Sequence, residues 1–199
     1  KKEDRLSRWV TELAERRGYW KAVVAVAAKN ARMPTDIVRS LATSESGGMR
    51  EALAQNPAIS SVSLLLANDQ DERVRQALAR NTAAGPDALL LLAHDGSSNV
   101  RATAAHNPSM PSEALGRLVQ DANRDVRSAV AWNPKTPVEI LRTLWSQGDV
   151  HFGLASNPAS PADVLRNLAS EPEIQVRNQL AANPAAPPDV LTTLAEDDR

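Results

Sequence analysis

An asparagine that closes a short alanine-rich stretch returns along this chain at an almost constant interval. Its positions are Asn30, Asn56, Asn81, Asn107, Asn133, Asn157 and Asn183, so successive asparagines lie 24 to 26 residues apart. A fixed period of this size is typical of repeat proteins, whose units stack on their neighbours. The sequence therefore predicts an array of about seven repeats instead of a single globular core.

Each repeat contains two short helical patterns, as the stretch VRSAVAWNPKTPVEILRTLW at residues 126–145 illustrates. In the first pattern, valine and alanine recur on one side of a helix. Asparagine, which tolerates a left-handed conformation, and the proline after it then end this helix. Thr136, Pro137 and Glu139 have the spacing of a capping box that begins the second helix. Such short helices are unstable alone, so neighbouring repeats must bury their apolar sides.

The repeated unit VRxAVAxNPxTPxExLxxLA resembles the leucine-rich repeat variant family, which is related in its logic to HEAT repeats. The resemblance covers roughly residues 20–199. It implies an all-α fold, a right-handed α-solenoid of alternating α- and 3₁₀-like helices without a β-sheet, which serves as a scaffold for partners. One founding type of the family carries a cysteine-ligated iron–sulfur module. The chain has no cysteine, so we expect neither that module nor a redox role.

The first twenty residues do not fit the repeat. Leu6, Trp9, Val10 and Leu13 mark one face of a helix. This pattern suits a cap over the first exposed core surface of a solenoid, and a partner- or membrane-binding helix is the alternative. The predicted organisation is thus an amphipathic capping helix at residues 1–20 and one continuous solenoid at residues 21–199.

Composition restricts the function classes further. The absence of cysteine excludes disulfides, thiolate catalysis and zinc fingers. The net charge of −1 argues against a protein driven mainly by nucleic-acid binding. The apolar stretches are too short to span a bilayer and no signal peptide is visible, so we expect a cytoplasmic location.

One arginine per repeat forms a ladder, usually with an acidic residue in the loop before it. Its members are Arg50, Arg75, Arg101, Arg127 and Arg177. Guanidinium groups bind carboxylates in a bidentate geometry, which favours a structural ladder that ties loops together. The alternative is a phosphate-binding stripe that, with the basic first fifty residues, follows a nucleic-acid backbone. The recurring asparagines, and the acids near the start of each second helix, are interpreted as structural.

The exposed positions of the first helix vary more and carry the functional prediction. The residue after each arginine and the residue before each asparagine are four apart, so they share one face. His106, Trp132 and Phe152 bring aromatic rings to positions that are otherwise mostly polar or small. We expect these three to anchor a protein or peptide partner, with Gln55, Arg80 and Ser128 adding polar contacts. Local packing of the two large aromatics is the alternative, and the resemblance implies that this face is concave.

No catalytic or metal-binding pattern is present. His94, His106 and His151 do not have the spacing of a metal site. A phosphate-binding glycine loop and a nucleophile elbow are both missing from the sequence. We therefore predict a scaffold without catalytic residues, cofactor or metal, which binds a protein or peptide. Nucleic-acid binding through the arginine ladder is the second hypothesis, and the partner's identity and the oligomeric state are not readable.

Overall fold

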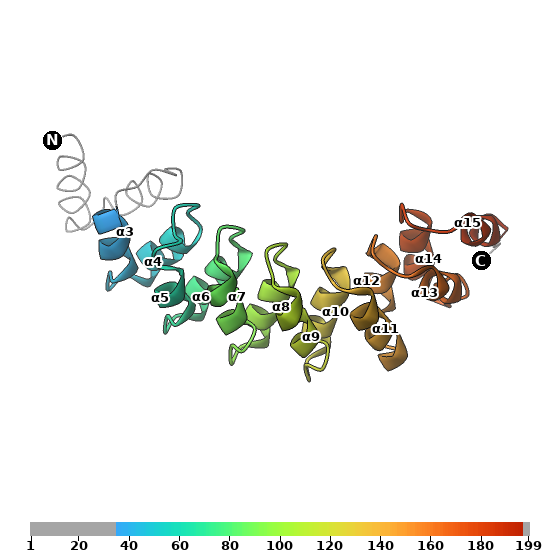
Figure 1. Cartoon of the computed structure of the whole chain (residues 1–199), viewed down its shortest axis with the longest axis horizontal. Helices are drawn as coiled ribbons and strands as arrows, with labels where there is room; N and C mark the ends of the chain where they lie inside the picture. The colour runs from blue at the N-terminus through green and yellow to red at the C-terminus, as the bar shows by residue number, and fades with distance from the viewer. Residues whose placement is uncertain (1–34, 197–199) are drawn as a thin grey trace. The chain divides into compact units, whose positions relative to one another are not determined.

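The computed structural model describes residues 35–196, and its regular elements in this range are all α-helices. The chain divides into two compact units, a first unit at residues 1–109 and a second unit at residues 110–199. The predicted capping helix at residues 1–20 and the first repeat asparagine, Asn30, lie outside the described residues. Within each unit the helices form the stacked pairs of an α-solenoid, which confirms the predicted fold class (Figure 1).

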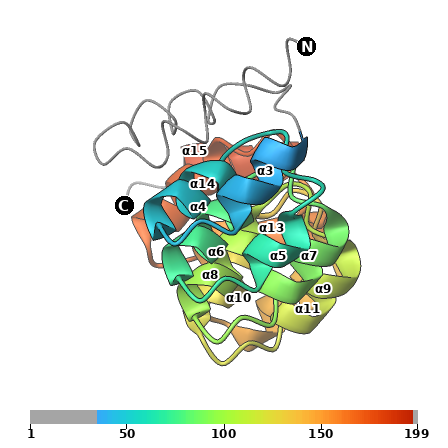
Figure 2. The same ribbon diagram turned by 90° about the vertical axis from the view of Figure 1, so that its left-hand side faces the viewer.

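The first unit contains two layers of helices after an initial helix. Its helices are α3 (Thr35–Ala42), α4 (Gly47–Ala54), α5 (Ser63–Ala67), α6 (Glu72–Arg80), α7 (Pro86–Leu92) and α8 (Ser98–His106). Helix α6 packs between α4 and α8, while α5 packs on α7. Figure 2 shows α4, α6 and α8 in one column and α5 and α7 in the other. We call the helix that ends at the repeat asparagine the first helix of each repeat, and its partner the second helix.

The second unit repeats this arrangement. Its helices are α9 (Ser112–Leu118), α10 (Arg124–Trp132), α11 (Val138–Gln147), α12 (His151–Ser156), α13 (Ala162–Leu168), α14 (Ile174–Ala181) and α15 (Pro188–Ala195). The first helices α10, α12 and α14 pack on one another in sequence, and second helices fill the spaces beside them. Second helices are α-helical throughout the described range, so the 3₁₀-like character implied by the family resemblance is not seen there.

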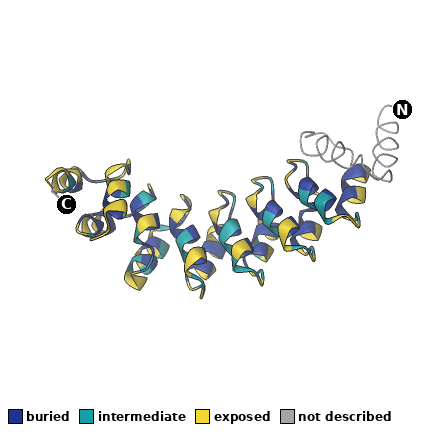
Figure 3. Cartoon of the chain, turned by 180° about the vertical axis from the view of Figure 1, so that it is seen from behind, coloured by how far each residue is buried: buried dark blue, intermediate teal, exposed yellow. Residues whose placement is uncertain are grey.

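Alanine, valine and leucine fill the space between the two layers. Val126, Val130 and Leu141 are completely buried, and equivalent positions in other repeats are buried as well. Figure 3 shows buried residues on the sides that helices turn toward their neighbours and exposed residues on the outer sides. No helix of the described residues is both long and apolar enough to cross a membrane.

The repeat asparagines connect successive repeats through their side chains. The Asn107 amide donates to the carbonyls of Ala79, at 2.7 Å, and Asn81, at 3.0 Å, in the preceding repeat. Its side-chain oxygen accepts from the Ser109 amide at 2.8 Å. The left-handed conformation expected at these positions is wrong, because Asn107 has φ −65° and ψ 125°. An extended backbone is the conformation that a following proline favours. In this conformation the Asn107 side chain reaches the carbonyls of the preceding repeat.

The predicted capping box is also wrong. Helix α11 has Pro137 at its N-cap, and no side chain caps it. Thr136 is buried, and its hydroxyl donates to the Val130 carbonyl at 2.6 Å. Ser160 does the same for the Leu154 carbonyl, also at 2.6 Å. The Val130 and Leu154 carbonyls also accept from the backbone amides of Asn133 and Asn157, so each hydroxyl adds a second bond where a first helix ends. Acids such as Glu139 lie in the first turn of the second helix and favour its dipole.

Candidate partner-binding surface

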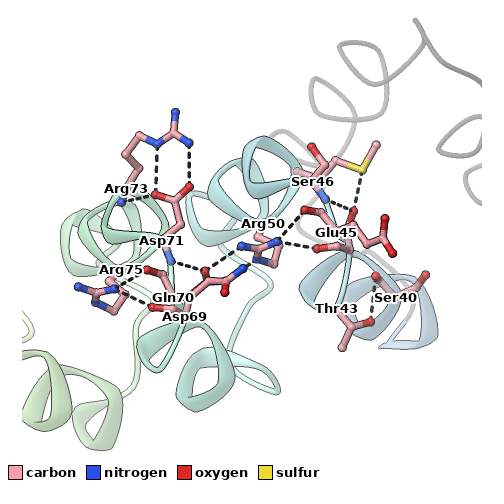
Figure 4. A network of polar contacts seen from close by, with 12 residues as sticks. Ser40, Thr43, Glu45, Ser46, Arg50, Asp69, Gln70, Asp71, Arg73 and Arg75 are labelled. Atoms are coloured by element: carbon pink, nitrogen blue, oxygen red, sulfur yellow. Dashed lines mark hydrogen bonds and ion pairs between the residues drawn. The ribbon is translucent and has the colours of Figure 1, made fainter.

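The arginine ladder ties the loops of adjacent repeats together. Arg50 donates from Nε and Nη2 to the two carboxylate oxygens of Asp69, at 2.5 and 2.9 Å (Figure 4). Its Nη1 donates to the Ser44 carbonyl at 2.6 Å. Arg50 therefore binds its own loop through a carbonyl and the following loop through a carboxylate. This is the predicted structural ladder, with the acid coming from the next loop.

The same geometry recurs along the row. Arg75 pairs with Asp95, with Nε 2.5 Å from Oδ2, and donates to the Asp69 carbonyl at 2.7 Å. The remaining members also donate to loop carbonyls, Arg101 to Asp95 at 2.8 Å, Arg127 to Asp121 at 2.6 Å and Arg177 to Glu171 at 2.6 Å. Phosphate binding by this row stays a prediction, and these guanidinium groups already bind protein oxygens.

Charge pairing in this ladder shifts the pKa of its acids. Burial of Asp69 acts to raise the pKa of its carboxyl, but hydrogen bonds from Arg50 and the Asp71 amide outweigh burial. The pKa of Asp69 therefore lies below its usual 3.8. The side-chain hydrogen bond to Asp69 raises the pKa of Arg50. Both groups thus remain charged at neutral pH, as a charge-assisted bond requires.

One repeat of the second unit departs from the ladder. His151 occupies the arginine position, and its Nδ1 lies 2.9 Å from Glu171 Oε1. The imidazole contacts the Trp145 ring, with centroids 4.9 Å apart and planes inclined by 35°. The loop before it turns at Gly148, whose φ of 76° is left-handed and therefore favours glycine. The connection to the next repeat is thus kept here with a shorter side chain and a shorter loop.

Three of the predicted contact residues lie in the first unit. Gln55 follows α4, while Arg80 and His106 are the last residues of α6 and α8. All three residues are exposed. Partial burial of the His106 imidazole lowers its pKa. Because α6 packs between α4 and α8, these positions form a row of polar side chains. The first unit therefore presents a polar face at the ends of its first helices.

The other three predicted residues lie in the second unit, where the structure brings two of them into contact. The rings of Trp132, on α10, and Phe152, on α12, have centroids 5.4 Å apart and are inclined by 52°. Trp132 is 36% and Phe152 38% exposed, while Ser128 is half-buried on α10. The aromatic pair therefore packs locally and is also available at the surface, so the two interpretations of these side chains are compatible.

Gly153 explains how the aromatic pair forms. A Cβ at this position would lie 2.7 Å from Ala131 Cβ, 3.2 Å from Trp132 Cδ1 and 3.3 Å from the Ser128 carbonyl oxygen. These contacts are too close for any other residue without a shift of the helices. The missing side chain lets α12 approach α10, and this approach places Phe152 beside Trp132.

Sequence reasoning missed two features near this pair. Ile174, the first residue of α14, is 52% exposed. A hollow of about 340 Å³ lies beside Phe152, lined also by Gly148, Asp149 and Glu173. Asn178 follows Arg177 and lies on the predicted exposed face of α14. Ile174 lies four residues before Asn178 and shares that face, so the sequence could have located it one turn earlier in the helix. The hollow depends on the loop at Gly148 and has no comparable sequence signal.

No group of three or more potential metal ligands occurs in the part of the chain that the structure describes.

Comparisons with known proteins agree with this geometry. The sequence pattern of the family described as "Leucine rich repeat variant" matches residues 99–123, about the length of one repeat. A solved structure described as a leucine-rich repeat variant with a novel repetitive structural motif is similar with a TM-score of 0.56. It is 21% identical and covers 89% of this chain and 83% of its own. Among curated proteins, none matches the sequence.

A designed armadillo repeat protein in complex with the peptide (KR)4 aligns over 95% of this chain and 96% of its own, at 14% identity. Its TM-score of 0.29 is too low to indicate a shared arrangement of helices.

Proposed function

We propose that this chain, which has the fold of a leucine-rich repeat variant and carries a matching repeat at residues 99–123, binds a protein or peptide on the exposed face of α10, α12 and α14. One observation supports this most strongly. Trp132 and Phe152 are in contact and more than one-third exposed. The equivalent positions on α6 in the first unit hold Arg80 and Gln76, respectively. Exposed aromatic side chains on a rigid support are typical anchors of protein interfaces.

The scaffold makes the surface suitable for such a role. Trp132 and Phe152 lie on two packed helices, and the Asn157 amide ties their repeats by donating to the Ala131 and Asn133 carbonyls. A partner therefore meets a preorganised face and loses little free energy in ordering it. The proposal contains no catalytic step, in keeping with the general behaviour of repeat scaffolds.

The proposal is tested with random-peptide display on the whole chain. Wild-type protein is expected to enrich a family of related peptides, and the double variant Trp132→Ala, Phe152→Ala should bind synthetic copies of them at least about ten-fold more weakly. The matched control is Leu191→Ala, which removes a side chain that is 42% exposed on a second helix. Equal binding by the double variant and the wild type, with both folded by circular dichroism, would contradict the proposal.

A further inference from the structure

The aromatic pair belongs to a longer apolar line across the second unit. Phe152 and Asn178 occupy equivalent positions on α12 and α14, one residue after the ladder position. Trp132 lies four residues after the equivalent Ser128 on α10, and Ile174 lies four residues before Asn178. Since residues four apart share a helix face, Trp132, Phe152 and Ile174 form a diagonal across three successive first helices. We call this set the apolar diagonal.

Charged groups lie beside the middle of the apolar diagonal. The hollow next to Phe152 is open at Gly148, where nothing lies within 4 Å of the position a Cβ would take. Asp149 and Glu173 line it, and Arg124 lies on its wall. Arg124 donates from Nε to the Asp149 carbonyl at 2.7 Å. The lining therefore combines an aromatic ring, two carboxylates and one guanidinium group, together with the side chains of His151 and Gln175.

We propose that the occupant of this face is an extended peptide segment with two apolar side chains and a lysine or arginine between them. One apolar side chain covers Trp132 and Phe152, and the other covers Ile174. The basic side chain enters the hollow, near Phe152 and Glu173. This inference rests on the proposed function and specifies the chemistry of the partner.

The spacing of the two apolar side chains follows from helix geometry. From Phe152 to Ile174, the packed helix axes lie about 8–10 Å apart, and the offset of four residues along the helix adds about 6 Å. The step between the two anchors is therefore about 10–12 Å. An extended chain advances about 3.3 Å per residue, so the apolar residues of the peptide should lie three to four positions apart.

Electrostatics select a basic residue for the position between the anchors. An aromatic ring attracts a cation over its face, and Glu173 is an exposed carboxylate at the same hollow. Asp149 pairs with Arg127 through Oδ2, and its Oδ1 is buried without a hydrogen-bond partner. Glu173 is therefore the exposed carboxylate that a ligand would meet. Arg124 opposes a basic ligand, and its removal should therefore strengthen binding.

Random-peptide display on wild-type protein and on two charge variants tests this inference. Wild-type selections should contain lysine or arginine between two apolar residues three to four positions apart. Glu173→Gln should weaken the selected peptides by about two- to five-fold, and Arg124→Gln should strengthen them by a similar factor, both more clearly at low ionic strength. The matched control is Glu139→Gln, which removes an exposed carboxylate from α11 and should change nothing.

The outcomes separate this inference from the proposed function. Enriched peptides that need Trp132 and Phe152 but lack a basic residue would overturn the inference and leave the proposed function standing. Enriched peptides with a basic residue that respond equally to Glu173→Gln and Glu139→Gln would also overturn it. Failure to enrich any peptide would count against both. Self-association that Phe152→Ala abolishes, measured by sedimentation, would assign the face to a second copy of the chain and overturn the inference.

Discussion

The two units share one scaffold but differ on the exposed face of their first helices. In the first unit the C-terminal ends of these helices carry Gln55, which follows α4, and Arg80 and His106, which are exposed and polar. In the second unit the equivalent face carries the aromatic contact between Trp132 and Phe152. The buried asparagine bonds have the same pattern in both units. Stacking therefore depends on side chains that face inward, and the outward positions are free to differ.

The two units also differ in the ladder, at the repeat that contains His151. Arg50 and Arg75 make bidentate bonds to aspartate in the first unit. His151 makes a single bond to Glu171 in the second unit and contacts the Trp145 ring. The departures around His151, namely Gly148, Phe152 and Gly153, gather at the apolar diagonal and its hollow. A break in the repeat pattern therefore coincides with the surface that we propose to be functional.

The largest effect should come from the scaffold that the units share. Asn107→Ala in the first unit and Asn157→Ala in the second each remove a buried amide that bonds two carbonyls. Each variant also loses the side-chain oxygen that accepts from the Ser109 or Ala159 amide. Loss of these three buried bonds should lower the free energy of unfolding by about 2–4 kcal/mol in both variants. Urea titrations followed by circular dichroism measure this. A large loss in one unit and none in the other would show that the asparagine bonds do not support both units equally.

Two glycine-to-alanine substitutions in the second unit should change the free energy of unfolding in opposite directions. Gly153→Ala places a methyl group 2.7 Å from Ala131 Cβ, and this overpacking should cost about 1–3 kcal/mol. Gly116 is an exposed residue in the middle of α9. The methyl group of Gly116→Ala would meet only Ile140 Cδ1, at 3.6 Å. It should add about 0.5–1 kcal/mol through helix propensity. Thermal unfolding measures both changes, and a stabilising Gly153→Ala would refute the close approach of α10 and α12.

Acid should weaken the ladder bond between Arg50 and Asp69. Because the pKa of Asp69 lies below 3.8 in the folded chain, its bond to Arg50 stabilises the fold above that pH. This contribution is lost as pH falls through the folded value. Asp69→Asn should therefore be less stable than wild type at pH 7, by an amount that shrinks below about pH 4. Glu171→Gln keeps an acceptor for His151 and should change stability less at pH 7, as urea titrations across pH would show.

Exposed ion pairs between second helices should matter least. The pair between Arg166 and Asp189 joins α13 to α15, with side chains 53% and 58% exposed. Solvent and salt screen such pairs. Arg166→Ala should therefore leave the urea midpoint unchanged at physiological salt. A midpoint shift as large as that of Asp69→Asn would contradict the distinction between buried and exposed pairs.

Sequence reasoning succeeded where a residue acts within its own repeat or through the repeat period. The spacing of the asparagines located the end of every first helix in the described residues, and the arginine row located the ladder. It failed at Asn107 and Thr136, where local rules predicted a left-handed residue and a helix cap. Both side chains instead satisfy backbone carbonyls at the ends of first helices, and a cap rule does not include those more distant partners.

The sequence by itself determined the all-α repeat, its register and the two large aromatics on the exposed face. These features follow from periodicity, because each repeat must present the same apolar positions to its neighbours. Only the tertiary structure decided that Gly153 brings Phe152 against Trp132, and that Gly148 leaves a hollow between Asp149 and Glu173. Such contacts depend on how closely two helices approach, and that distance is set by the side chains between them.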